Sequence, residues 1–182
     1  MNLFKEDVDK NYRIYRSNLI VDNQQQFIDE INLATGHFKK EFPEKDSTWT
    51  YAYYNTFCLT SPSMLFHNLF TELKHVIREY AGHDRPLWMQ SWINYHMPDQ
   101  LLSWHNHYWP FHGYISIDPH VSRTVFEEYE IENKIGNVYI GPGLRRHTVI
   151  ADENYHTPRI TLGYDVLDAP FTPNGIFSLI PI

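Results

Sequence analysis

Two histidines, His105 and His107, lie one residue apart in the stretch SWHNHYWPFHGYISID, residues 103–118. In an extended strand, residues i and i+2 point to the same face, so both imidazoles can reach one metal ion. A third histidine, His147, begins the segment HTVIAD after a glycine-proline turn, and a neighbouring antiparallel strand could carry it to the same place. Three neutral imidazoles leave coordination positions open on iron, zinc or copper. The alternative for an H-x-H pair is two hydrogen-bonded rings near a strand end.

A candidate anion site lies further along the chain. Arg159 and Thr161 alternate in the segment RITLGYDVL, so a strand would place a guanidinium and a hydroxyl group on one face. This pair predicts a socket for a carboxylate, because a guanidinium binds a carboxylate through two parallel hydrogen bonds. A surface salt bridge is the alternative role for Arg159.

These side chains need strands to bring them together, and the second half of the chain has the pattern of strands. From Arg85 onward, short alternating runs are separated by turn residues. The runs are PLWMQSWINYH, LLSWHNH, HGYISID, TVFEEYEI, NVYIGP, HTVIAD and RITLGYDVL. So many short strands in succession are typical of an antiparallel sandwich or barrel of jelly-roll type.

The first half of the chain is mainly helical in pattern. Residues 11–21 alternate as an edge strand does, and a helix is expected from Asp22 to Gly36. A stronger amphipathic helix is expected to begin after Ser61 and Pro62 and to end at Gly82. We therefore expect an α+β fold with a jelly-roll core and N-terminal helices packed on one sheet.

Length and composition restrict the class of protein. The 182 residues fit a single domain, 1–182, with a helical part at about 1–84 and a jelly-roll core at about 85–168. The apolar runs are far shorter than the roughly 20 residues of a membrane span, and the first residues do not resemble a signal peptide, so we expect a cytoplasmic protein. The net charge of −7 argues against binding to a nucleic-acid backbone. Cys58, the single cysteine, is expected to be buried.

Four segments resemble, in their order and spacing, the Fe(II)- and 2-oxoglutarate-dependent oxygenases: WHNH, HGYISI, GNVYIGPGLRRHTV and RITLGYDV. That superfamily has a double-stranded β-helix (cupin-like) core that carries an H-x-D/E motif, a distal histidine, and an arginine with a serine or threonine two residues later. The similarity covers about residues 85–168 and is greatest to the small bacterial and phage-type branch, whose first motif is H-x-H. His112 and Gly141 stand where that branch has a serine and a phenylalanine.

The resemblance implies that His105, His107 and His147 hold Fe(II) and that Arg159 and Thr161 bind the distal carboxylate of the co-substrate 2-oxoglutarate. The implied reaction is hydroxylation of a small-molecule or peptidyl substrate by dioxygen, with decarboxylation of 2-oxoglutarate to succinate. His107 departs from the wider superfamily, where most members have a carboxylate at this position.

Asn94 and Tyr95 resemble the polar positions on the first core strand that assist 2-oxoglutarate binding in the family. His96 and His112 are expected to lie near the site without holding the metal. Four aromatic residues could form its walls: Trp92, Trp104, Trp109 and Tyr114.

Two other classes of function remain open. A cupin-type dioxygenase with three histidine ligands would not use 2-oxoglutarate and would not require Arg159 and Thr161. A non-catalytic jelly-roll binding protein would have no affinity for a metal. The edge strand expected at residues 11–21 could pair with a second copy of the chain to form a homodimer.

Overall fold

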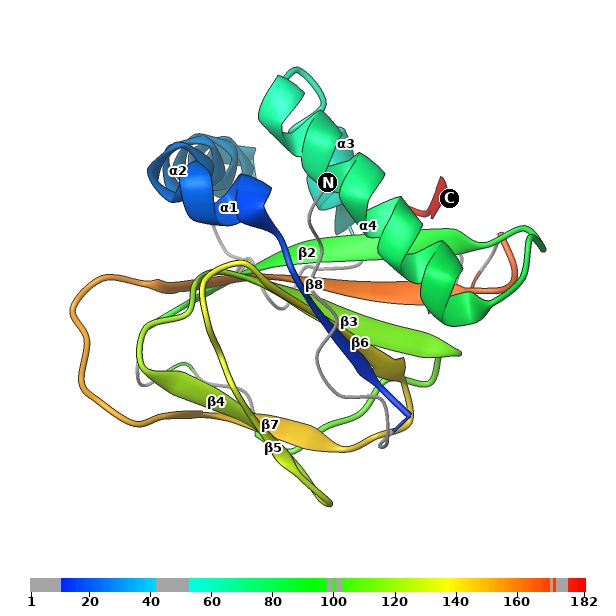
Figure 1. Cartoon of the computed structure of the whole chain (residues 1–182). Coiled ribbons are helices and arrows are strands. Elements are labelled where there is room, and N and C mark those ends of the chain that lie inside the picture. Colours follow the sequence, from blue (N-terminus) through cyan, green and yellow to red (C-terminus); the bar gives the residue numbers. More distant parts are fainter. Residues whose placement is uncertain (1–10, 42–52, 98–99, 101–102, 171, 173–176) are drawn as a thin grey trace.

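Two antiparallel β-sheets lie one above the other, and helices cover the outer side of the larger sheet (Figure 1). The structure is a computed structural model that describes residues 11–41, 53–97, 100, 103–170, 172 and 177–182. The mixture of helices and antiparallel strands is the expected α+β class, and the two layers of strands are jelly-roll-like.

The larger sheet has six strands in the order β1-β6-β3-β8-β2-β9. Their bounds are Arg13–Arg16 for β1, Asn137–Pro142 for β6, Phe111–Asp118 for β3, Arg159–Leu167 for β8, Trp88–His96 for β2 and Ile180–Pro181 for β9. The smaller sheet has three strands in the order β5-β4-β7. They run from Glu130 to Glu132 (β5), from Ser122 to Phe126 (β4) and from His147 to Ala151 (β7).

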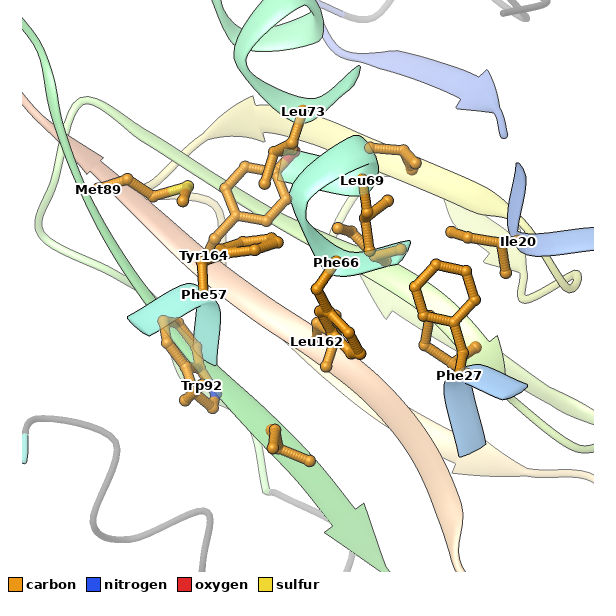
Figure 2. Close-up of a cluster of buried hydrophobic side chains, with 14 of the residues drawn as sticks. Ile20, Phe27, Phe57, Phe66, Leu69, Leu73, Met89, Trp92, Leu162 and Tyr164 are labelled. Carbon is orange, nitrogen blue, oxygen red and sulfur yellow. The ribbon is translucent and has the colours of Figure 1, made fainter. Parts of the chain in front are cut away.

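Four helices lie on the larger sheet: α1 (Asn18–Asp22), α2 (Gln24–Glu41), α3 (Thr56–Leu59) and α4 (Met64–Ala81). Helix α4 begins where the Ser63 hydroxyl accepts a hydrogen bond from the Phe66 backbone N–H, and it ends at Gly82, whose φ of 68° suits a residue without a side chain. Its buried apolar residues pack toward β8, as the positions of Phe66, Leu69 and Leu162 show (Figure 2).

Strand β8 is buried on both faces, because one face packs against the helices and the other faces the smaller sheet. Ile160, Leu162, Tyr164 and Val166 belong to the core beneath the helices. The alternate residues face the space between the sheets, where Arg159, Thr161 and Gly163 line a pocket. A second aromatic core fills the rest of that space: Tyr12, Ile14, Tyr114, Phe126, Tyr129, Ile131 and Tyr139.

The expected elements differ from the structure mainly where a polar cap or a close turn intervenes. The edge strand expected at residues 11–21 stops at Arg16, because the Ser17 hydroxyl caps helix α1 by accepting from the Ile20 backbone N–H. The helix expected to stop at Gly36 continues to Glu41. Gly36 has open space around it and no backbone strain, so it costs the helix only some stability.

Other differences concern the strands and the cysteine. The run TVFEEYEI is a hairpin rather than one strand, closed by a hydrogen bond from Phe126 N–H to the Tyr129 carbonyl. In the run LLSWHNH, residues 101–102 lie outside the described residues, and the rest contributes a single bridge at His105 rather than a strand. Cys58 is exposed rather than buried, since it lies on the outer side of the short helix α3. No helix in the described part of the chain has the length and apolar composition of a membrane span.

Candidate metal centre

His105 and His147 come from distant segments and are joined by their backbones. The N–H of His105 donates to the His147 carbonyl at 3.0 Å, and the N–H of His147 donates back at 2.8 Å. The backbone N–H of His107 donates to the carbonyl of Gly143 at 2.8 Å, in the turn before β7. The H-x-H segment is therefore fixed against the start of β7, as the three-histidine hypothesis requires.

The three side chains converge on one point of the pocket. One ring nitrogen of each of His105, His107 and His147 lies within 4.8 Å of the others. The ring centroids of His105 and His147 are 4.4 Å apart, and that of His107 is 5.3 Å and 5.5 Å from them. The predicted ligands are thus brought together with spacing that suits one ion.

Hydrogen bonds fix which nitrogen of each ring is available. Nδ1 of His105 bonds the carbonyl of Ser103 at 2.8 Å, and Nδ1 of His147 bonds the carbonyl of Arg145 at 3.2 Å. Nδ1 of His107 lies 3.0–3.1 Å from the two carboxylate oxygens of Asp165. Carbonyl and carboxylate oxygens only accept, so Nδ1 carries the proton in each ring and Nε2 keeps its lone pair.

The Nε2 atom of His107 is the observation that best fits a bound metal ion. This atom is buried and has no hydrogen-bond partner among the described residues. A buried polar atom of this kind costs free energy unless a ligand satisfies it. A metal ion held by three Nε2 atoms would do so, and the outward Nδ1 hydrogen bonds are those that orient histidine ligands.

The electrostatics of the rings also favour metal binding over protonation. Burial lowers the pKa of His147 to about 2, and its histidine neighbours act in the same direction. Burial likewise lowers the pKa of His105. Neutral imidazoles are the form that coordinates first-row metals.

A second group, His107, His112 and Asp165, lies directly behind the first. His112 on β3 is the cross-strand partner of Asp165 on β8, and its Nδ1 lies 2.9 Å from Oδ1 of Asp165. Although burial alone would raise the pKa of the Asp165 carboxyl, His107 and His112 outweigh it and lower that pKa to about 2. Asp165 is therefore a carboxylate shared by two imidazoles.

This second group does not have the geometry of a chelating site. The rings of His107 and His112 are stacked, with centroids 3.6 Å apart and planes 7° from parallel. Both rings also direct Nδ1 at the same carboxylate, so hydrogen bonds to Asp165 describe this group better than a second metal site does.

The predicted anion socket is buried and positively charged. Arg159 is 3% exposed and bonds two hydroxyl groups, Ser122 Oγ at 3.2 Å and Thr161 Oγ1 at 3.5 Å. No acidic side chain among the described residues forms an ion pair with it. Burial lowers the pKa of Arg159 to about 10, which leaves the guanidinium charged at neutral pH. A buried cation without an anionic partner costs free energy, and an anion bound in the pocket would offset that cost.

Asn94 and Tyr95 lie on opposite faces of β2. Asn94 lines the pocket, and its amide donates to Thr161 Oγ1 at 3.2 Å. The hydroxyl of Tyr95 instead donates to the side chain of Asn32 on α2 at 3.0 Å. Strand alternation thus brings Asn94 to the socket and directs Tyr95 to the helices, so the structure does not place Tyr95 with the other predicted site residues.

Only some of the aromatic residues expected to form the pocket walls line the pocket. Trp92 and Tyr114 line the pocket, as do His96 and His112. Trp104 is largely exposed, and the ring of Trp109 packs against Phe177 at 5.6 Å. Asp165 was not predicted from the sequence. It is the fourth residue of the alternating series that begins with Arg159 and Thr161, and this period of two is the signal that could have revealed it.

Comparisons with known proteins agree with this fold at the level of architecture. No protein-family model and no curated protein matches the chain. Among solved structures, the chain is similar to the crystal structure of the non-heme alpha ketoglutarate-dependent epimerase SnoN from nogalamycin biosynthesis. The TM-score is 0.53 at 10% sequence identity, over 87% of this chain and 77% of that one. The chain therefore shares the overall fold of that solved structure, which agrees with the jelly-roll-like arrangement of its two sheets.

Proposed function

We propose that the protein is an Fe(II)- and 2-oxoglutarate-dependent dioxygenase that hydroxylates a small-molecule or peptidyl substrate. The observation that carries this proposal is a buried guanidinium, Arg159, that shares one pocket with three convergent histidines. A metal site alone fits many enzymes. A cation without an acid partner in the same pocket calls for a co-substrate with a carboxylate.

In this proposal His105, His107 and His147 bind the metal through Nε2, since their Nδ1 atoms donate to other acceptors. The ion would satisfy the buried Nε2 of His107. Three protein ligands would leave coordination positions on the ion for the co-substrate and a further small ligand. Nitrogen ligands suit iron, although they do not exclude zinc or copper.

Arg159 binds the distal carboxylate of 2-oxoglutarate, and Thr161 donates to the same group. Asn94 holds the Thr161 hydroxyl at 3.2 Å and so orients it. The charge of Arg159, partly desolvated in the free protein, gains an opposite charge when the co-substrate binds. These residues thus select a dicarboxylate with a length that reaches from the metal to the socket.

The bound iron supplies the site at which dioxygen is activated. In the net reaction, 2-oxoglutarate, dioxygen and a substrate C–H bond would give succinate, carbon dioxide and an alcohol. One atom of dioxygen would enter succinate and the other the alcohol, while the carbon dioxide would come from the C1 carboxylate of 2-oxoglutarate. The protein binds and orients the reactants, and the buried pocket limits the access of water. We further propose that the core is a double-stranded β-helix of the branch with an H-x-H first motif, and that the protein acts in the cytoplasm.

Anaerobic titration tests the proposal. Purified protein is given Fe(II) and then 2-oxoglutarate, and a visible charge-transfer band is expected when the keto acid chelates the metal. Admission of dioxygen should then yield succinate, even without the primary substrate, at a slow rate. Arg159→Ala, which removes the socket and leaves the histidines, is the matched control and should bind metal but show the band only at much higher 2-oxoglutarate.

The absence of a carboxylate from the three-histidine set favours one second candidate, a cupin-type dioxygenase that uses no 2-oxoglutarate. Tight metal binding without a band would support that candidate. Absence of metal binding would reject both enzymes in favour of a binding protein. Because the structural neighbour is named an epimerase, product analysis should also distinguish hydroxylation, which adds an oxygen atom, from epimerisation, which leaves the mass unchanged.

A further inference from the structure

We propose that Asp165 is a positioning residue that holds His107 in its metal-binding tautomer and supplies, one hydrogen bond away, the negative charge that the H-x-H motif lacks. This inference rests on the metal site of the proposed function.

Asp165 lies behind the pocket rather than in it. Its side chain is fully buried, and among the described residues no acid lines the pocket itself. Its Oδ1 atom lies 3.0 Å from Nδ1 of His107 and 2.9 Å from Nδ1 of His112, and its Oδ2 atom lies 3.1 Å from Nδ1 of His107. The carboxylate therefore acts on the metal site through the imidazoles and does not compete for the metal.

A carboxylate is the group that satisfies both rings in the same way. It can only accept, so each Nδ1 must donate and each Nε2 must keep its lone pair. An amide in the same place offers one acceptor and one donor. If Asn replaced Asp165 with its oxygen at the Oδ1 position, its NH₂ group would take the place of Oδ2 beside Nδ1 of His107. Two donors would then face each other, which favours transfer of the His107 proton to Nε2.

His112 provides the second hydrogen-bond donor to the buried carboxylate of Asp165. Two N–H donors stabilise the charge of Asp165 better than one, since a buried carboxylate needs several hydrogen bonds. The stacked His112 ring also limits how far His107 can rotate, with the centroids 3.6 Å apart. Trp92 lies beside the two stacked rings, with centroid distances of 5.7 Å to His107 and 6.1 Å to His112 and with interplanar angles of 21° and 23°. The His107 ring is thus held by a hydrogen bond at one edge and by stacking against His112 on one face.

The first test reads the tautomers directly in the metal-free protein. Long-range proton–nitrogen NMR of histidine-labelled wild type should show His107 and His112 protonated at Nδ1, the minor form of a free imidazole. In Asp165→Asn, one of the two should change to the Nε2-protonated form. Asp168→Asn, an exposed acid just beyond the same strand, is the control and should change neither. Wild-type His107 protonated at Nε2 would overturn the proposal without any variant.

The second test measures metal affinity with Fe(II) or Co(II) under anaerobic conditions. Asp165→Asn should weaken binding about 10- to 100-fold, the range found when a partner of a metal-bound histidine is removed. His107→Asp puts a carboxylate beside that of Asp165, and the two charges would repel each other. The double variant His107→Asp with Asp165→Asn should therefore bind more tightly than His107→Asp alone.

This reversal separates positioning from a merely structural role. If Asp165 only stabilises the fold, its replacement should weaken binding in both backgrounds, and that result would overturn the inference while leaving the metal site intact. If wild-type protein binds neither metal, the proposed function fails, and the inference fails with it. Metal binding by the wild type and an unchanged affinity in Asp165→Asn would reject the inference alone.

Discussion

The indole of Trp92 lies against Gly163 on the neighbouring strand, in the space that a side chain at position 163 would need. A Cβ atom on Gly163 would overlap the indole ring, which is rigid and lies beside the rings of His107 and His112. The absence of a side chain at Gly163 therefore leaves room for Trp92 beside the histidines. Gly163 thus affects the candidate metal site although it is not one of the proposed ligands.

Gly163→Ala should displace Trp92, lower the free energy of unfolding by about 1–3 kcal/mol, as overpacking does, and weaken metal binding. Urea unfolding and metal titration measure the two effects. The control is Gly36→Ala, since Gly36 lies in helix α2 with open space around it. That change should stabilise the protein by about 0.5–1 kcal/mol. Wild-type stability and metal affinity in Gly163→Ala would contradict the role assigned to this contact.

Arg159→Ala should weaken 2-oxoglutarate binding by about 1.5–3 kcal/mol, the scale of a lost charged hydrogen-bonding partner, and should leave metal content unchanged. Arg159→Lys should restore only part of the affinity, because an ammonium group lacks the planar fork of a guanidinium. Anaerobic calorimetry on the metal-loaded protein measures both. An unchanged affinity in Arg159→Ala would reject the socket.

Arg159→Met should make the protein more stable in the absence of 2-oxoglutarate, because it replaces a buried charge that has no acid partner with an apolar chain of similar length. Thermal unfolding with and without 2-oxoglutarate checks this. The wild type should gain stability from the co-substrate, and the variant should gain little. A variant that is less stable than the wild type would show that the bonds to Ser122 and Thr161 outweigh the desolvation of the charge.

Each of His105→Ala and His147→Ala should abolish iron binding, and His107→Ala should lower the affinity clearly while the fold is kept. These losses are expected because the three rings of the wild type would share one ion. Metal analysis together with circular dichroism measures content and folding. His75, on helix α4 and outside the groups that could hold a metal, provides the control variant His75→Ala. Wild-type iron content and succinate production in His107→Ala would refute the three-histidine site.

Asn94→Ala should weaken 2-oxoglutarate binding by about 1 kcal/mol, the typical contribution of one hydrogen bond, because Thr161 loses the amide that orients it. Tyr95→Phe is the matched change on the opposite face and should leave the affinity as it is, since its hydroxyl bonds Asn32 instead. Equal losses in the two variants would contradict the placement of these neighbours.

The sequence was informative wherever one element decides the outcome. The apolar stripe of α4 and the alternation of β8 were predicted because each depends on a single period. The meeting of His105 with His147 depends instead on pairing between distant segments, and the strand expected at His105 is a single bridge. Asp165 could not be inferred as a partner of His112, because their pairing depends on the register between β3 and β8, which shifts at an irregularity near Ser116.

Tyr95 illustrates a different limit. The sequence places Asn94 and Tyr95 side by side, and only the face that β2 turns toward the helices decides which one reaches the pocket. Likewise, the predicted edge strand ends at Ser17 because the hydroxyl of this residue caps a helix, and such local hydrogen bonds compete with strand pairing.

Because His107 is hydrogen-bonded to Asp165, a metal ion bound by His107 and the other two histidines would link the two sheets. His105 and His147 lie at the start of the smaller sheet, whereas Asp165 belongs to the larger one. An ion bound by all three rings would hold the sheets together on the side away from the helices, as a disulfide crosslinks two strands. Removing the metal should then speed amide hydrogen exchange in β7 and residues 103–109, and leave exchange in α4 unchanged.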